Sequence, residues 1–93
     1  MSSARLVSKY ISSAEHVLGE IQLVERKTAL SADEVRKVVE YAKAYFDDAK
    51  YYMDQKKFDV SLTSVVYCEG LLDALRLLGT VKFEWPTKER KEK

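Results

Sequence analysis

The sequence predicts an all-α fold: an antiparallel three-helix bundle with a short extended aromatic C-terminal arm and a charged tail. Three stretches repeat apolar residues in steps of three and four, which is the spacing of one helix face. Short connections join them, so neighbouring helices are expected to run antiparallel. After Gly79 the apolar period changes to two, which is typical of extended chain. Because 93 residues leave room for one core, we assign residues 1–80 to the bundle and residues 81–93 to the arm and tail.

The first predicted helix runs from about Ser3 to Lys27. Gly19 lies inside it and costs about 1 kcal/mol relative to alanine, which makes this position a candidate for a close contact with another helix. The apolar face of this helix consists of Val7, Ile11, Ala14, Leu18 and Ile21.

The second predicted helix has the clearest start signal in the chain. Ser31 and Glu34 have the spacing of a capping box, in which each side chain accepts a hydrogen bond from the other residue's backbone N–H. Leu30 and Val35 add a hydrophobic staple. The helix is expected to continue to about Gln55. Its apolar face consists of Val35, Val39, Ala42, Phe46, Ala49 and Met53.

The third predicted helix runs from about Val60 to Leu78. Asp59 is the expected N-cap, and Gly79 is the expected stop, because glycine readily adopts the left-handed conformation that ends helices. The inward positions are Leu62, Val65, Cys68, Leu72, Leu75 and Leu78. In the arm that follows, the apolar residues are Val81, Phe83 and Trp85. Residues 87–93 are expected to form a disordered charged tail.

Charge and composition exclude several classes of function. Sixteen basic residues balance 15 acidic ones, so direct nucleic-acid binding is disfavoured and any basic attraction belongs to the tail. The single cysteine, Cys68, excludes an internal disulfide and a cysteine-cluster metal site. No apolar run approaches the roughly 20 residues of a membrane span, and no signal-peptide core is present, so we expect a cytoplasmic protein without membrane contact. The absence of asparagine together with abundant charge favours a thermophilic source.

Nucleophilic catalysis has few candidate residues. His16 is the only imidazole, and Cys68 lies on the inward face of another helix, so a Cys–His pair would have to form in a dry core. The glycines are scattered and form no phosphate-binding loop. We therefore expect no catalytic residue and no cofactor.

Acidic residues offer an alternative hypothesis, a metal-dependent or catalytic module that uses Asp48, Glu69 and Asp73. Glu69 and Asp73 lie one helical turn apart and could hold a divalent cation or supply an acid and a base. Arg76 lies three residues beyond Asp73, and this spacing favours an ordinary ion pair on the helix surface.

The aromatic residues are the most unusual feature. Tyrosine beside a helix core stripe combines apolar area with a hydroxyl group, which protein interfaces favour. The competing interpretation is that these residues only cover the edges of a small core. The candidate partner contacts are Tyr41, Tyr45, Tyr52, Phe83 and Trp85.

About half of the chain resembles an archaeal family known as domain of unknown function 357. The resemblance rests on Tyr-Phe-Asp-Asp-Ala at 45–49, Lys-Phe-Asp at 57–59 and the run from Tyr67 to Gly79. It implies an all-helical fold and an archaeal source, and it implies no activity. The polar positions that match the family pattern are Asp48, Gly70 and Asp73.

These observations lead to one functional hypothesis. We expect a non-enzymatic helical module for protein–protein interaction, an accessory or stabilising subunit of a larger archaeal complex. A DNA polymerase assembly is an example of such a complex, offered by analogy. Self-association is the other expected use of the surface. The remaining alternatives are the metal-dependent or catalytic module and a nucleic-acid accessory protein that acts through its basic tail.

Overall fold

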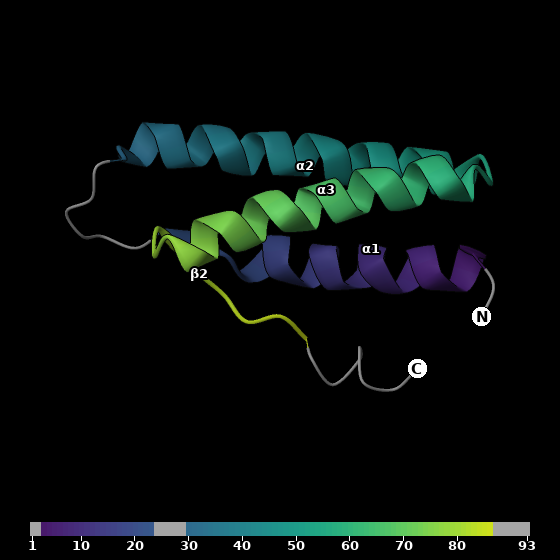
Figure 1. Cartoon of the computed structure of the whole chain (residues 1–93), viewed down its shortest axis with the longest axis horizontal. Helices are drawn as coiled ribbons and strands as arrows, with labels where there is room; N and C mark the ends of the chain where they lie inside the picture. Colours follow the sequence, from purple (N-terminus) through teal and green to yellow (C-terminus); the bar gives the residue numbers. More distant parts are fainter. Residues whose placement is uncertain (1–2, 24–29, 87–93) are drawn as a thin grey trace.

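The computed structural model describes residues 3–23 and 30–86, and the prediction of a mostly helical fold is confirmed. Figure 1 shows α1 running from right to left, α2 returning from left to right, and α3 running back across the two on the near side. The predictions for residues 24–27 and 87–93 lie outside the described residues. The elements are α1 (Ser3–Glu20), β1 (Gln22–Leu23), α2 (Ala32–Asp54), α3 (Phe58–Leu77) and β2 (Val81–Lys82).

The core lies where the three helices meet and extends into the C-terminal arm. Two buried hydroxyl groups are satisfied by carbonyl oxygens: Ser61 donates to Ala49 at 2.6 Å, and Thr80 donates to Leu75 at 2.9 Å. The first of these bonds ties α3 to α2. The buried hydrophobic cluster comprises Ala14, Val17, Val35, Val39, Ala42, Phe46, Ala49, Val65, Cys68, Leu72, Leu75, Val81 and Phe83.

The first helix is shorter than predicted, because α1 ends at Glu20 and not at Lys27. After it the chain becomes extended and pairs antiparallel with the arm, with Gln22 opposite Lys82 and Leu23 opposite Val81. The spacing of the apolar residues predicted that the helix would continue past Glu20, because Ile21 lies on the same apolar face. The non-local strand pair supplies other hydrogen-bond partners for this backbone, and a local pattern cannot reveal such a pair.

The start of α2 is as predicted. The Ser31 backbone N–H donates to Glu34 Oε1 at 2.9 Å, and the Glu34 N–H donates to Ser31 Oγ at 3.1 Å, so both halves of the capping box are present. The helix ends at Asp54, one residue before the expected end. Its last carbonyls accept bonds from Lys56 and Lys57, and Lys56 adopts a left-handed φ of 61°.

The third helix begins earlier than predicted, and the assignment of Asp59 as its N-cap is wrong. Lys57 is the N-cap and makes no side-chain capping bond, while Asp59 lies in the first turn. The Lys57 N–H already bonds to the Tyr52 carbonyl at the end of α2, so the reversal is completed by backbone groups and α3 can start at once.

The end of α3 confirms Gly79 as the stop. Gly79 has a φ of 76°, its N–H donates to the Arg76 carbonyl at 3.0 Å, and the Thr80 N–H donates to the Leu75 carbonyl at 3.1 Å. This pair of bonds is the Schellman motif, which uses a left-handed residue to close a helix. The turn directs the chain into β2.

Candidate protein-interaction surface

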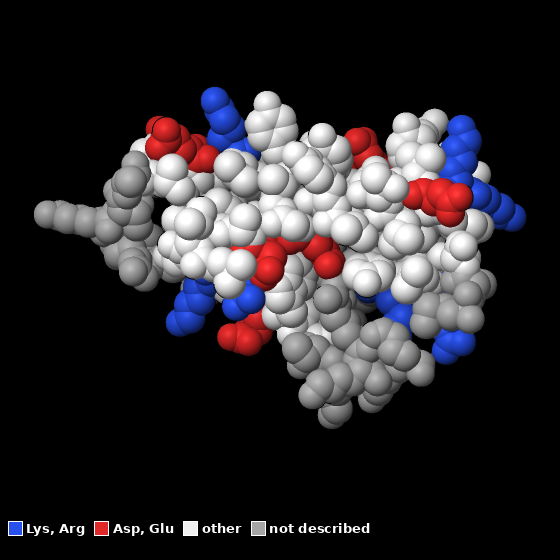
Figure 2. Space-filling model, in the orientation of Figure 1, with Lys and Arg blue, Asp and Glu red and all other residues white. Residues whose placement is uncertain are grey.

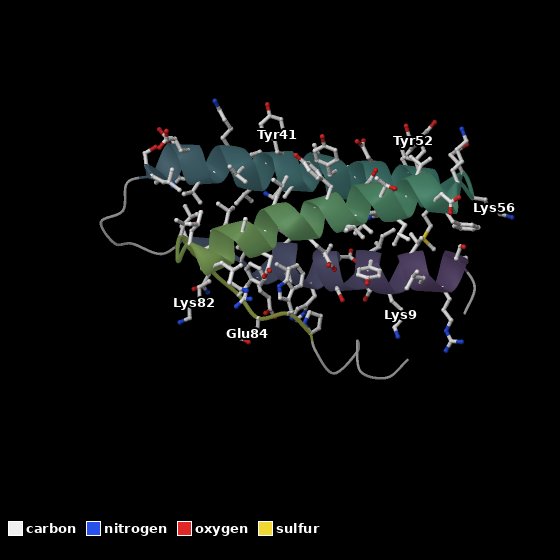
Figure 3. All side chains as sticks on the ribbon, in the orientation of Figure 1. Lys9, Tyr41, Tyr52, Lys56, Lys82 and Glu84 are labelled. Carbon is white, nitrogen blue, oxygen red and sulfur yellow. The ribbon has the colours of Figure 1, made fainter. Side chains whose placement is uncertain are left out.

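The aromatic arm folds back onto the bundle. Val81 is 3% exposed and Phe83 is 7% exposed, so both belong to the core, and Trp85 packs against that core. The Phe83 and Trp85 rings meet edge to face, with centroids 5.0 Å apart. Lys82 and Glu84 point away from the helices (Figure 3). The expectation that Phe83 would contact a partner is therefore corrected: the alternating period buries it inside the chain.

Asp73 holds the arm in place. Its Oδ1 accepts a hydrogen bond from the Trp85 indole N–H at 2.9 Å and from Arg76 Nε at 3.1 Å. The ion pair between Asp73 and Arg76 that their spacing predicted is present. Trp85 is half-buried and fixed by this bond. The Asp73 side chain thus joins α3 to the arm.

The acidic residues of the alternative metal or catalytic hypothesis lie on two different helices. Asp48 is exposed on α2, while Glu69 and Asp73 lie on α3. Among residues 3–23 and 30–86, no three histidine, cysteine, aspartate or glutamate side chains come together in a way that could hold a metal ion. The structure therefore does not bring Asp48, Glu69 and Asp73 together as ligands.

Cys68 and His16 have unrelated surroundings. The Cys68 side chain is fully buried, and burial, with a smaller contribution from the charge of Glu69, raises the pKa of its thiol to about 12. A thiol with so high a pKa is a poor nucleophile at neutral pH. His16 is exposed and lies 3.3 Å from Glu20, measured from Nε2 to Oε1. Cys68 is thus a small core residue.

Five tyrosines on α2 and α3 are exposed or half-buried, and we call them the tyrosine surface. Its members are Tyr41, Tyr45, Tyr51, Tyr52 and Tyr67. Tyr45 packs on the core and meets Tyr67 edge to face, with centroids 4.5 Å apart. Tyr51 and Tyr52 meet in the same way at 5.2 Å. Tyr41 is 60% exposed and Tyr51 is 59% exposed, and Figure 3 shows Tyr41 standing on the outer edge of α2.

A second patch, the α3 outer face, was missed by the sequence reasoning. Every residue in it is exposed and none is charged, although the opposite side of α3 is buried in the core. Val66 is 47% exposed and Leu77 is 73% exposed. Figure 2 shows an uncharged band along the near side of the molecule, where α3 lies, with most charged residues toward its edges. The α3 outer face consists of Thr63, Val66, Gly70, Ala74 and Leu77.

Gly70 lies in the middle of the α3 outer face and has no packing role within the chain. A Cβ added to it would meet nothing within 4 Å, and the same holds for Gly19 on α1. The expectation that Gly19 marks a close contact between helices of this chain is therefore wrong. An open depression of about 350 Å³ lies beside Gly70. It is lined by Val66, Glu69, Gly70, Asp73, Arg76 and Trp85.

Residues 9–81 match the model of a family described as "Protein of unknown function (DUF357)". The chain belongs to this family. The part shared with the DUF357 family contains the tyrosine surface and the α3 outer face, and it ends at Val81, before Phe83 and Trp85.

Neither the curated proteins nor the solved structures gave a match to the chain. Within the described residues, no helix is long and apolar enough to cross a membrane.

Proposed function

We propose that this chain is a non-enzymatic interaction module, an accessory or stabilising subunit that binds a larger protein through the tyrosine surface. The observation that carries the proposal is the exposure of Tyr41 and Tyr51 at 60% and 59%. Covering the core explains the half-buried Tyr45, which packs on it, but does not explain rings that lie mostly in solvent.

The chemistry of the tyrosine surface suits protein binding. Tyrosine buries a large ring at a low cost in side-chain entropy, and residues of this kind dominate interface energetics. The edge-to-face contacts of Tyr45 with Tyr67 and of Tyr51 with Tyr52 restrain the rings before binding. Such pre-organisation lowers the entropy that association loses.

Charged residues lie beside the tyrosines on α2, as residues of an interface rim would. Glu40 and Lys43 form an exposed ion pair at 3.5 Å on the same helix, and Asp47 and Asp48 are exposed one turn farther on. Polar rims of this kind are usual around apolar interface centres. Its exposure on α2 supports a role for Asp48, which matches the family pattern, at the edge of the contact with a bound protein.

The wider context follows from the resemblance and from composition. The absence of asparagine and the abundance of charge favour a thermophilic archaeon, and the single buried cysteine suits a reducing cytoplasm. An information-processing complex such as a DNA polymerase assembly is the partner that we suggest by analogy. The balanced charge does not favour direct binding to DNA.

Capture from native extract tests the proposal. The immobilised chain is compared with the double variant Tyr41→Ser, Tyr51→Ser, and bound proteins are identified by mass spectrometry. The matched control is His16→Ala, Glu20→Ala, which removes an exposed ion pair on α1, a helix that carries no member of the tyrosine surface. We expect the wild type and the control to retain the same protein, and the tyrosine variant to bind it at least about tenfold more weakly.

Several outcomes of the capture experiment would count against the proposal. Equal capture by the tyrosine variant would show that the tyrosine surface is not the binding site, and a wild type that retains nothing above bare resin would remove the interaction role. Far-ultraviolet circular dichroism should be the same for all three proteins, since the substituted side chains are exposed. A partner without a DNA polymerase component would overturn the suggested context alone.

A further inference from the structure

We propose that the protein bound at the tyrosine surface presents an arginine side chain, which pairs with the carboxylate of Asp48 and packs against the neighbouring tyrosine rings. The assignment rests on the proposed function and adds the chemistry of the partner. Steps of four, three and four residues place Asp48 on the same face of α2 as three tyrosines, and we call this face the α2 stripe. In chain order it consists of Tyr41, Tyr45, Asp48 and Tyr52. Figure 3 shows Tyr41 and Tyr52 on the same outer edge of α2.

The charge of Asp48 is not matched within the chain. Its side chain is exposed, and within residues 3–23 and 30–86 it has no hydrogen bond and no ion pair. By contrast, Asp33 and Asp73 each lie 3.1 Å from an arginine three residues farther along the same helix. Charges across an interface are arranged so that opposite signs meet, so the group that covers Asp48 is expected to be a cation.

The lysines on either side of Asp48 in the sequence make contacts elsewhere on α2. Lys43 Nζ lies 3.5 Å from Glu40 Oε2, and Lys50 Nζ lies 5.4 Å from the centroid of the Phe46 ring. Lys50 is two residues from Asp48, which places it about 200° around the helix. Neither lysine neutralises Asp48, so its negative charge remains available to a partner.

Two tyrosine rings flank Asp48, one turn away on each side. Tyr45 is three residues before it and Tyr52 is four residues after it, and helical residues at these spacings are neighbours on the surface. The Tyr45 ring meets Tyr67 edge to face at 4.5 Å, and the Tyr52 ring meets Tyr51 at 5.2 Å. These contacts restrain both rings beside the carboxylate before a partner binds, which lowers the entropy lost on association.

Arginine fits this combination of groups better than lysine does. The guanidinium group is planar, so it can donate two parallel hydrogen bonds to a carboxylate and can also stack on an aromatic ring. The lysine ammonium group is compact and strongly hydrated, and it offers no flat face to a ring. The carboxylate of Asp48 would repel phosphate groups, so a nucleic acid is disfavoured at this surface.

A titration of the purified chain with hexa-arginine, followed by NMR of the tyrosine ring resonances, tests the assignment with a defined probe. Hexalysine carries the same charge and separates recognition of guanidinium from attraction to charge alone. We expect hexa-arginine to shift the ring resonances of Tyr45 and Tyr52 and to bind at least about threefold more tightly than hexalysine.

Asp48→Asn should weaken the binding of hexa-arginine at least about threefold, and the variant should fold because the side chain is exposed. Glu15→Gln is the matched control. It removes one exposed carboxylate from α1, which carries no member of the tyrosine surface, and should leave the binding of hexa-arginine unchanged. Equal binding by wild type and Asp48→Asn, equal binding of hexa-arginine and hexalysine, or shifts that spare Tyr45 and Tyr52 would each overturn the assignment.

Capture from native extract separates this assignment from the proposed function. A protein that is lost with Tyr41→Ser, Tyr51→Ser but retained equally by Asp48→Asn would leave the tyrosine surface as the binding site and would overturn the arginine contact. Binding of hexa-arginine that depends on Asp48, in a chain that captures no protein, would support the arginine site and would remove the interaction role.

Discussion

Replacing Phe83 with alanine should detach the C-terminal arm and destabilise the whole bundle. Phe83 is 7% exposed and contacts Trp85 edge to face at 5.0 Å, so the substitution leaves a cavity and removes a ring pair. Truncation of a buried phenylalanine costs about 3 to 5 kcal/mol. The total stability of a 93-residue domain is about 5 to 14 kcal/mol, so the expected loss is a large part of it.

Two signals can follow the Phe83→Ala variant during thermal denaturation. Trp85 is the only tryptophan, so its fluorescence reports the arm, whereas far-ultraviolet circular dichroism reports the helices. We expect the melting temperature to fall by roughly 12 to 40 °C, from about 4 to 8 °C per kcal/mol for a domain of this size. Both transitions should move together, because Phe83 belongs to the same core cluster as residues of all three helices.

Glu84→Ala is the matched control for Phe83→Ala, since it changes the exposed neighbour on the same arm. Its effect on the free energy of unfolding should stay within about 0.5 kcal/mol. If Phe83→Ala is as stable as Glu84→Ala, the arm does not pack on the bundle in solution. The assignment of Phe83 to the core would then be refuted.

Three further changes test local features. Ser31→Ala should lower the free energy of unfolding by about 0.5 to 2 kcal/mol in chemical denaturation, because the capping box at the start of α2 is lost. Lys56→Gly should raise the free energy of unfolding by about 0.5 to 1 kcal/mol, because Lys56 has a φ of 61°, a left-handed conformation that glycine adopts without strain. Lys57→Gly should not raise it, because Lys57 has a φ of −94°. The pKa of the Cys68 thiol is about 12 in the folded protein and about 9 when exposed, so stability is full below pH 9 and is lost as pH rises toward 12. Relative to a Cys68→Ala variant, the wild type should lose about 1 kcal/mol between pH 8 and pH 10, and the absence of any difference would show that the thiol is not buried.

The parts of the fold that sequence predicts well depend on contacts within a few residues. The capping box joins Ser31 and Glu34, which are three residues apart, and the left-handed turn at Gly79 is closed by hydrogen bonds to carbonyls three and five residues earlier. Both signals are therefore complete within a short window of sequence. The periodicity of α2 is predictable for the same reason, because it has one buried face.

The errors arise where a distant segment decides the local conformation. Ile21 continues the helical stripe of α1, but the next two residues pair with Val81 and Lys82, about sixty residues away along the chain. The alternating period after Gly79 correctly indicates extended chain. It cannot show whether that chain folds back, and the position of Phe83 depends on this.

The α3 outer face was missed because α3 has two apolar faces. The inward stripe predicted from the spacing includes Val65, Leu72 and Leu75, which are buried. It does not include Val66 or Leu77, which are exposed. The available signal was a second row of uncharged positions along α3, from Thr63 to Leu77. Such a pattern indicates a helix with contacts on more than one side, but only the structure shows which side lacks a partner.

Two positions that match the family pattern now have different explanations. Asp73 is explained within the chain, since its carboxylate holds Trp85 and Arg76. Gly70 is not, because the space around it is empty and a larger residue would favour the helix. A residue that costs stability in the isolated chain is expected where function conflicts with local preference. The α3 outer face around Gly70 is therefore the place where an explanation from outside the chain is most needed.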